Sequence, residues 1–341
     1  MSEPAIQETL EEYGAMTRDL MAHYLPTPEA DHYLYGPAAD YPLRGGKMMR
    51  PSICIATARL FGASLEDSLK VAVSIELLHN ALLIHDDIED ESETRRGQPT
   101  LHMKHGIPIA LNVGDALALS SLRPLIHVFP RIGPWMGLKL IEDMERMARE
   151  TAEGQAMELA WRHDNTLKLA PEDYLVMVLK KTCWLATIFP CRAGALLGSR
   201  SSIAEDAFMR FGFFVGAAFQ ISDDTLNIEA EAIYGKEACG DLLEGKRTLM
   251  LIDLLNLLRG DDLHRLVTFL SRKRSELAED ELGWVREKII DLGCLSRARS
   301  AARGMAGAAQ HEFDLTFGHL PQSRDKAFLS SLACWSLSRS H

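Results

Sequence analysis

Apolar residues recur along most of the chain every three or four positions, which is the spacing of a helix with one face in a core. In the first half of the chain this spacing predicts helices over residues 3–25, 51–61, 65–93, 107–122 and 135–161. The strong alternation of apolar and polar residues that marks a half-buried strand is missing. The pattern therefore predicts an all-α fold.

The second half of the chain continues in the same way. Pro171 suits the first turn of a helix, and Pro190 is expected to kink that helix. Further helices are predicted over residues 202–231, 249–258, 264–270, 282–292, 297–313 and 325–337. The segment from Pro26 to Gly46 is rich in Pro, Gly, Asp and Tyr, and it is predicted to be a loop. Helical proteins of 341 residues can form one domain, so the chain is interpreted as a single domain, residues 1–341.

Composition narrows the class of partner. Hydrophobic residues make up 47% of the chain, which is enough for a globular core, and the low aromatic content of 7% favours helices over strands. Lys and Arg number 37 against 48 Asp and Glu, so the net charge is -11. Because phosphate neutralisation needs a positive surface, nucleic acid is not an expected partner. Any anion site must therefore be local.

The cysteines and the chain start indicate a compartment. The six cysteines form no C-x-x-C pair, and most lie within apolar helical runs. That pattern predicts reduced cysteines in the core of a cytoplasmic protein. The first residues are acidic and amphipathic, unlike a signal peptide. The longest apolar runs, such as residues 211–221, are shorter than the roughly 18 residues of a membrane span, so no transmembrane segment is expected.

An acidic cluster ends the predicted helix over residues 65–93. Asp86 and Asp90 are four residues apart, so their carboxylates share one face of the helix. Carboxylates in that register repel unless a cation lies between them, and Mg²⁺ is usually held by one or two carboxylates together with substrate phosphates. Arg95 and Arg96 follow, and arginine forks match diphosphate oxygens. The alternative is a solvated helix end of ordinary surface charges.

A second acidic cluster follows another apolar helical run. Asp223 and Asp224 lie one turn after Gln220, and Asn227 shares a face with Asp223. More than a hundred residues separate the two clusters, so they can face one another across a helical bundle. Bundles commonly build metal sites from carboxylates on facing helices. The pair of clusters favours the metal interpretation over the surface one.

Local cations supply several anion sites. A Gly-Gly turn precedes Lys47 and Arg50, which would share one face at the start of a helix, although two surface cations are the alternative. His79 lies two turns before Asp86 on the same stripe. Residues 234–248 combine glycines and cations, as a flexible phosphate lid would. With the apolar stripe beneath the acidic cluster, the pattern indicates a substrate with a diphosphate head and a hydrocarbon tail.

These segments together resemble a known family. The motifs GGKMMRP, LLHNALLIHDDIEDESETRRG, GQAMEL, KT, FQISDD and GKEACGDLLEGKRT, spread over residues 45–248, resemble those of the trans-type isoprenyl diphosphate synthases of the polyprenyl synthetase family. They are closest to the motifs of geranylgeranyl diphosphate synthases. The resemblance implies an all-α isoprenoid synthase bundle around a deep central cavity, a homodimer, and three Mg²⁺ ions in each active site.

The resemblance also implies a role for each matching residue. Metal ligands would be Asp86, Asp90 and Asp223, supported by Asp87 and Asp224. The allylic diphosphate would be held by Arg95, Lys181, Lys236 and Lys246. Isopentenyl diphosphate would be held by Lys47, Arg50, His79 and Arg96. The catalytic residues would be Lys181, Thr182 and Gln220, and the last two would stand near the allylic carbon.

The implied reaction is the condensation of isopentenyl diphosphate with an allylic diphosphate. Metal ions and cations take up negative charge as pyrophosphate leaves, and the double bond of isopentenyl diphosphate attacks the allylic cation, head to tail. The departing pyrophosphate is the expected base for the last proton. Closure of residues 235–247 would exclude water.

Some positions depart from the family pattern, and others bear on product length. Asn227 stands where many members carry Asp, Glu158 where Asp is usual, and Trp184 where a smaller residue is common. Farnesyl-producing members often carry an aromatic residue four or five positions before the first Asp, where this chain has Leu82 and Ala81. The small Ala81 predicts a longer product, geranylgeranyl diphosphate, which Ala81→Phe should shorten.

Other functions stay open at this point. A longer-chain polyprenyl diphosphate synthase would share every motif. A class I terpene cyclase on the same fold would need the metals but no isopentenyl diphosphate site, so Lys47, Arg50, His79 and Arg96 argue against it. A non-catalytic subunit of a partner synthase would typically lack the aspartate clusters.

Overall fold

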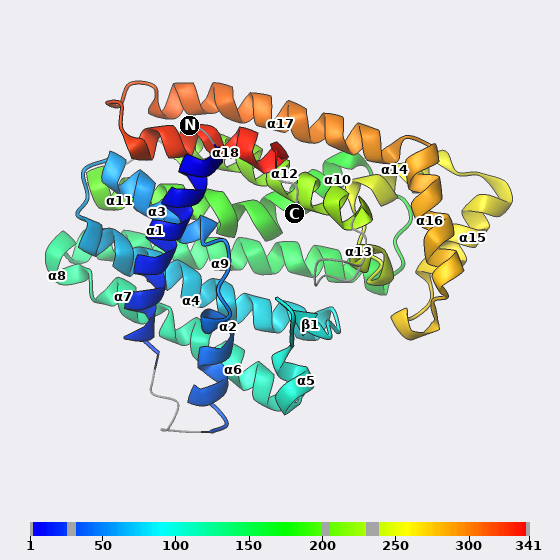
Figure 1. Cartoon of the computed structure of the whole chain (residues 1–341), viewed down its shortest axis with the longest axis horizontal. Coiled ribbons are helices and arrows are strands. Elements are labelled where there is room, and N and C mark those ends of the chain that lie inside the picture. The colour runs from blue at the N-terminus through cyan, green and yellow to red at the C-terminus, as the bar shows by residue number, and fades with distance from the viewer. Residues whose placement is uncertain (1–2, 26–31, 200–204, 230–238, 339–341) are drawn as a thin grey trace. The chain divides into compact units, whose positions relative to one another are not determined.

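The computed structural model describes residues 3–25, 32–199, 205–229 and 239–338 of the chain. Within those ranges the regular structure is helical apart from one two-stranded hairpin, so the all-α prediction is confirmed (Figure 1). The first half contains α1 (Glu3–Ala22), α2 (Tyr35–Leu43), α3 (Met49–Leu60), α4 (Leu65–Glu89), the hairpin of β1 (Thr94–Arg95) and β2 (Gln98–Pro99), α5 (Leu101–His105), α6 (Ile107–Ser120), α7 (Leu122–Ile126) and α8 (Phe129–Ile132).

The second half has longer helices. It contains α9 (Pro134–His163), α10 (Pro171–Val178), the π-helix η2 (Leu179–Ile188), α11 (Phe189–Ser199), α12 (Glu205–Glu229), α13 (Gly240–Leu243), α14 (Leu249–Leu257), α15 (Gly260–Leu270), the 3₁₀-helix η3 (Arg274–Glu276), α16 (Glu279–Asp291), α17 (Cys294–Phe317) and α18 (Arg324–Ser338). At the predicted kink before Pro190, the structure changes from π-helix to α-helix.

The predicted loop over Pro26–Gly46 is wrong for its second part, which forms α2. Gly and two prolines suggest a loop locally. However, Pro37, Ala38 and Tyr41 are all buried, and the apolar contacts they make outweigh the weak helix propensity. This short helix supplies Tyr41 and positions Arg44 close behind it.

Contacts divide the chain into two compact units. Unit 1 comprises Met1–Ala148, Leu185–Gly212 and Glu312–Leu332, and unit 2 comprises Arg149–Trp184, Phe213–His311 and Ala333–His341. The predicted single domain stays a prediction. Each unit is described by itself below.

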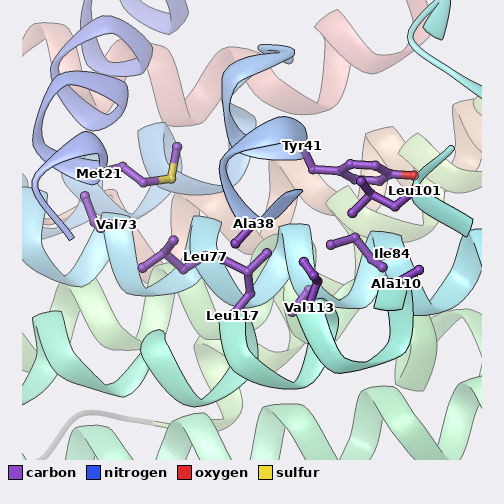
Figure 2. Packing of buried hydrophobic residues seen from close by; sticks show 11 residues of the cluster. Met21, Ala38, Tyr41, Val73, Leu77, Ile84, Leu101, Ala110, Val113 and Leu117 are labelled. Carbon is purple, nitrogen blue, oxygen red and sulfur yellow. The ribbon is translucent and has the colours of Figure 1, made fainter. Parts of the chain in front are cut away.

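The core of unit 1 fixes the rotation of α4. Val73, Leu77, Ala81 and Ile84 lie along one stripe of this helix and pack in a cluster with residues of α1, α2, α5 and α6 (Figure 2). The other members of this cluster are Met21, Ala38, Tyr41, Leu101, Ala110, Val113 and Leu117. The N-terminus of α4 is capped by Ser64, whose hydroxyl accepts the Asp67 N–H at 3.2 Å. Packing and capping together determine which way the acidic end of α4 points.

Two described helical segments are long and apolar enough to cross a membrane by length and composition, Ile107–Ile132 and Pro171–Ser199. The core helices of soluble proteins meet the same criterion. The most apolar part of Pro171–Ser199 is 67% buried within the protein, as expected of a core helix, whereas that of Ile107–Ile132 is 39% buried. Neither segment is clearly a membrane span.

Candidate active site

The first acidic cluster lies at the C-terminal end of α4 in unit 1. Asp86 is partly exposed, Asp87 is completely buried, and Asp90 caps the helix, its N–H donating to the Asp86 carbonyl at 2.9 Å. The neighbouring aspartates therefore face different surroundings. Asp86 and Asp90 lie one turn apart, as their spacing predicts, but Asp86 is partly exposed whereas Asp90 is buried, as is Asp87.

Asp87 is held by two donors. The Tyr41 hydroxyl donates to one carboxylate oxygen, and Arg95 donates to the other with its Nε at 2.9 Å and also with Nη2. The Nη2 atom of Arg95 lies 3.7 Å from Asp86 Oδ2. Burial raises the pKa of Asp87, and Arg95 opposes that rise. Asp87 thus fixes the guanidinium that was predicted to bind the allylic diphosphate.

The β1–β2 hairpin is anchored by Arg44, to which the sequence analysis assigned no role. Arg44 donates to the carbonyls of Arg95 at 3.1 Å and Pro99 at 2.7 Å, and its guanidinium lies 4.5 Å from the centre of the Tyr41 ring. The hairpin turn itself passes through Arg96 and Gly97, both with positive φ. Arg44 therefore ties α2 to the strand that carries Arg95.

Three of the four residues predicted to hold isopentenyl diphosphate gather around a buried carboxylate in unit 1. Burial raises the pKa of Glu76, but His79, Arg50 and Arg96 together lower it below the ordinary value. His79 Nδ1 lies 3.3 Å from Glu76 Oε1, and burial, with Arg50, lowers the pKa of His79. No role was predicted for Glu76, although its position as a charged residue within an apolar helical run could have indicated one.

The approach of Arg96 depends on a glycine. A Cβ on Gly46 would lie 2.7 Å from the Arg96 guanidinium, so a larger residue would displace that side chain. Lys47 is exposed, one residue before Met48, whose left-handed backbone precedes α3. The structure therefore brings Arg50, His79 and Arg96 together and leaves Lys47 at the surface beside the start of α3.

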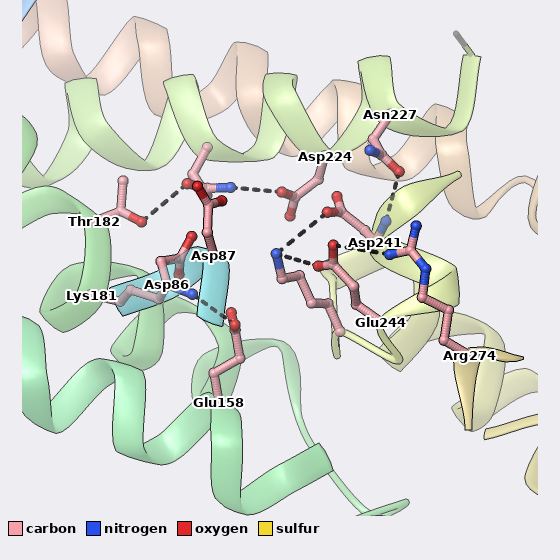
Figure 3. Close-up of polar contacts among 12 residues, drawn as sticks. Asp86, Asp87, Glu158, Lys181, Thr182, Asp224, Asn227, Asp241, Glu244 and Arg274 are labelled. Carbon is pink, nitrogen blue, oxygen red and sulfur yellow. Dashed lines mark hydrogen bonds and ion pairs between the residues drawn. The ribbon is translucent and has the colours of Figure 1, made fainter. Parts of the chain in front are cut away.

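The second acidic cluster lies on α12 in unit 2, and its aspartates also differ. Asp223 is partly exposed and Asp224 is buried. The Tyr174 hydroxyl donates to one oxygen of Asp224 at 2.7 Å. The Gln220 amide donates to the other oxygen at 2.7 Å (Figure 3). Thr182 in turn donates to Gln220 Oε1 at 3.0 Å. Burial, and then Asp241, raise the pKa of Asp224 to about 8.

Lys181 and Thr182 lie on the π-helix η2, a form often found at functional sites. Lys181 Nζ donates to Glu158 at 2.7 Å (Figure 3). The approach of α9 to η2 requires Gly154, because a Cβ there would lie 2.2 Å from the Lys181 backbone nitrogen. Glu158, which stands where the family usually has Asp, is thus the ion-pair partner of Lys181.

Lys246 belongs to a network of charges on α13 and the segment after it. Its Nζ lies 2.6 Å from Glu244 and 3.8 Å from Asp241, and Arg274 approaches Glu244 at 3.8 Å (Figure 3). Asn227 Oδ1 accepts the Asp241 N–H at 3.1 Å. Asn227 therefore anchors this segment to α12. Lys236 and residues 230–238 of the predicted lid lie outside the described residues.

Arg247 holds the same segment from the other side. It is buried and donates to the Thr166 carbonyl at 3.0 Å, to Asn165 Oδ1 at 2.6 Å and to the Gly245 carbonyl. Burial lowers the pKa of Arg247 to about 10. These bonds to backbone carbonyls fix the chain next to Lys246.

Among the described residues, no group of three or more His, Cys, Asp or Glu side chains could hold a metal by itself. The donors nevertheless suit Mg²⁺, because Asp86 and Asp90 supply carboxylate oxygens one turn apart at an end of α4 where Arg95 is already fixed. Mg²⁺ usually takes one or two carboxylates and completes its shell with phosphate oxygens and water. The residues therefore fit a metal that arrives with a diphosphate.

The two residues assigned to product length lie in different surroundings. Ala81 is fully buried within the unit 1 cluster. Leu82 is partly buried and is not one of the residues of that cluster. An aromatic ring at residue 81 would therefore have to displace side chains of the core cluster, whereas a ring at residue 82 would be added outside that cluster.

Comparisons with known proteins agree with these features. A model of the polyprenyl synthetase family matches residues 32–283. A geranylgeranyl pyrophosphate synthase of Geoglobus acetivorans is 31% identical over 336 residues, which are 98% of this chain and 100% of that protein. The crystal structure of a geranylgeranyl pyrophosphate synthetase from Pyrococcus horikoshii has a TM-score of 0.86 and 27% identity, over 99% of each chain.

A polyprenyl synthase of Caulobacter crescentus, solved with calcium and isoprenyl diphosphate, has a TM-score of 0.85 and 27% identity over 100% of this chain and 98% of that one. The structure thus has the all-α isoprenoid synthase fold. The chain belongs to the polyprenyl synthetase family of prenyltransferases.

Proposed function

We propose that this protein condenses isopentenyl diphosphate with allylic diphosphates, and that its main product is geranylgeranyl diphosphate. The observation that carries the proposal is the presence of two separate cation groups along α4 of unit 1. Arg95 is fixed by Asp87, and Arg50 and Arg96 gather with His79 over Glu76. Two diphosphate sites are needed for coupling, whereas a terpene cyclase needs only one.

Asp86, Asp90 and Asp223 would hold Mg²⁺, with three ions at each active site as the family resemblance implies. Bound Mg²⁺ supplies Lewis-acid catalysis by neutralising charge on the leaving pyrophosphate. Arg95, Lys181 and Lys246 assist from the protein side, and Lys236 would join them. The ion pairs of Lys181 with Glu158 and of Lys246 with Glu244 keep both cations ordered before a diphosphate replaces those carboxylates.

The oxygens of Thr182 and Gln220 would face the allylic carbon as it becomes positive. Their dipoles stabilise that charge without reorganisation, because Asp224 already orients the Gln220 amide. Lys47, Arg50, His79 and Arg96 would hold isopentenyl diphosphate for attack. Pyrophosphate leaves from the allylic carbon, the new bond forms there, and pyrophosphate accepts the proton that is lost.

Product analysis by mass spectrometry tests this function. Purified protein would be incubated with Mg²⁺, isopentenyl diphosphate and, in turn, dimethylallyl, geranyl and farnesyl diphosphate. Geranylgeranyl diphosphate from each starter is expected. Hydrocarbon released from an allylic diphosphate alone would indicate a cyclase, and no product from any pair would indicate a non-catalytic subunit.

Product length can be tested with two variants. Ala81→Phe should shorten the product, but overpacking of the core there is expected to cost about 1–3 kcal/mol of stability. Leu82→Phe adds the same ring outside the cluster and serves as the matched variant. An unchanged product from both variants would exclude these positions as the limit on chain length.

We also propose that the protein is a homodimer whose interface includes α6. Ile107, Leu111 and Leu119 on α6 and Ile126 on α7 are each about half exposed or more, with Leu119 at 72%. Several exposed large apolar side chains on consecutive helices are typical of a surface covered by a partner. Sedimentation should give a dimer, and Leu119→Asp should weaken it. A wild-type monomer at micromolar concentration would refute this interface.

The cysteines support a cytoplasmic location. All six are free, and five of them are buried. Buried free thiols are typical of proteins from reducing compartments.

A further inference from the structure

We propose that Tyr174 is a positioning residue for the ionisation of the allylic substrate, acting through Asp224 on the orientation of the Gln220 amide. The inference rests on the proposed function, because it concerns the same reacting carbon. Tyr174 touches neither diphosphate nor metal in this assignment. Its contribution is to decide which end of a neighbouring side chain faces the substrate.

The contacts form a directed series within unit 2. Tyr174 donates to Asp224 Oδ2 at 2.7 Å. Gln220 Nε2 donates to Asp224 Oδ1 at 2.7 Å (Figure 3). Thr182 then donates to Gln220 Oε1 at 3.0 Å. Each oxygen of the carboxylate receives one of these two donors, and both Tyr174 and Asp224 are buried. Tyr174, Asp224 and Gln220 lie on two elements, α10 and α12, while Thr182 comes from η2.

The series has only one favourable direction. In the structure, Asp224 Oδ1 accepts from the NH₂ end of the Gln220 amide, which directs the oxygen end of that amide toward Thr182. Thr182 then uses its proton on Gln220, which leaves its own oxygen lone pairs available. A flipped Gln220 would bring its carbonyl oxygen against Asp224 Oδ1, which accepts in this network, and the hydrogen bond between the two side chains would be lost. The orientation of the amide therefore follows from the chemistry of its neighbours.

Tyr174 stabilises the end of the series. Burial and the negative charge of Asp224 raise the pKa of Tyr174 well above its usual range, so the hydroxyl stays a donor at any working pH. Without it, one oxygen of Asp224 loses its donor and the carboxylate is free to rotate. Gln220 would then lose its fixed partner, and in some molecules its NH₂ group would face the developing cation.

The decisive experiment is a double-mutant cycle on kcat, measured at saturating substrates and Mg²⁺. Tyr174→Phe should lower kcat about tenfold, less than the loss of a whole preorganised dipole, with the KM for isopentenyl diphosphate unchanged. In a Gln220→Leu background, adding Tyr174→Phe should lower kcat less than about twofold, because the side chain through which Tyr174 acts is gone.

A matched control separates positioning from stability. Tyr13 is also buried and donates to an aspartate, Asp325 Oδ1, at 2.5 Å, but both residues lie in unit 1 on α1 and α18. Tyr13→Phe should lower the melting temperature by an amount comparable with Tyr174→Phe and leave kcat unchanged. Asp224→Asn, whose amide can accept or donate, provides a second route to a scrambled Gln220 and should also lower kcat if Tyr174→Phe does not fold.

Several outcomes would overturn the proposal. These are an unchanged kcat in Tyr174→Phe, an equal loss in the Gln220→Leu background, or, in place of a lowered kcat, a higher Mg²⁺ concentration needed to reach the wild-type rate. The last result would mean that Tyr174 acts on the metal site through Asp223. Wild-type protein without coupling activity would instead refute the proposed function, so the two failures are distinct.

Discussion

Asp87 in unit 1 and Asp224 in unit 2 occupy equivalent places in their clusters. Each is the second of two consecutive aspartates at the end of an apolar helix, each is buried, and each accepts a hydrogen bond from a tyrosine hydroxyl. Their other donors differ, since Asp87 has the Arg95 guanidinium and Asp224 has the neutral Gln220 amide. Burial raises the pKa of both carboxyl groups. At Asp87 the Arg95 cation opposes the rise, whereas at Asp224 burial and the nearby Asp241 raise the pKa to about 8.

The difference shows how one short motif can support two tasks. At the first cluster the buried aspartate orients a cation, which suits the binding of a diphosphate. At the second cluster it orients an amide dipole, which suits a positive centre. In both clusters the preceding aspartate, which we propose as a metal ligand, is partly exposed.

The largest expected effect comes from the aspartates that the clusters have in common. Asp86→Ala and Asp223→Ala should each lower kcat at least about a thousandfold, because each removes a proposed ligand of the metals that would neutralise the leaving group. Steady-state kinetics over a range of Mg²⁺ concentrations would measure this, with exposed Glu93→Gln as a control. A nearly normal rate in Asp223→Ala would place the metals on the first cluster alone.

The buried aspartates should differ in their effect on stability. Asp87→Asn leaves the Arg95 guanidinium without its carboxylate and should cost about 2–3 kcal/mol of unfolding free energy. Asp224→Asn keeps its neutral partners and should cost less than about 1 kcal/mol. Urea unfolding of the metal-free variants measures both. Equal losses of unfolding free energy would show that the different donors, Arg95 and Gln220, do not make the two sites differ in stability.

The pH dependence of stability should differ as well. With a folded-state pKa of about 8, Asp224 keeps a proton in the folded protein that the unfolded chain releases near pH 4, so this group lowers stability as the pH rises from about 4 to about 8. Asp224→Asn should remove part of that loss, about 2–4 °C in melting temperature for each kcal/mol recovered. Thermal unfolding in EDTA at pH 5 and pH 8 would measure it. Parallel pH profiles for wild type and variant would contradict the assignment.

The smallest effect concerns the tyrosine of the first cluster. Tyr41→Phe removes the second donor to Asp87 and loosens Arg95, at a cost of about 1 kcal/mol. Because Arg95 would hold substrate, we expect a KM for the allylic diphosphate raised about fivefold with kcat unchanged. A lowered kcat without a change in KM, as expected for Tyr174→Phe, would mean that the two networks act alike.

Helical periodicity was sufficient to predict most of the fold, including the helices that carry the aspartates. The family resemblance, and not the periodicity, indicated the grouping of Arg50, His79 and Arg96, because matching motifs accompanied each residue. Neither signal indicated Tyr41 or Tyr174. Their partners lie 46 and 50 residues away in the sequence, and only the packing of separate helices brings them within hydrogen-bond distance.

Two further features had local signals that pointed elsewhere. The prolines and glycine of α2 favoured a loop, although burial of Pro37, Ala38 and Tyr41 makes it a helix. The π-helix η2 has the same apolar spacing over a few residues as an α-helix, so the sequence gives no means of distinguishing them. The roles of Glu158 as partner of Lys181 and of Asn227 as a backbone anchor likewise depend on distances across helices.

The cysteines differ in exposure, so the protein carries its own site for specific thiol labelling. Burial raises the pKa of Cys54, Cys183, Cys191, Cys239 and Cys294, so these five are shielded and mostly protonated, and only Cys334 on α18 is exposed. A thiol-reactive dye under native conditions should therefore label one position without any engineering. Slower labelling of the other five would then measure how often the surrounding helices open.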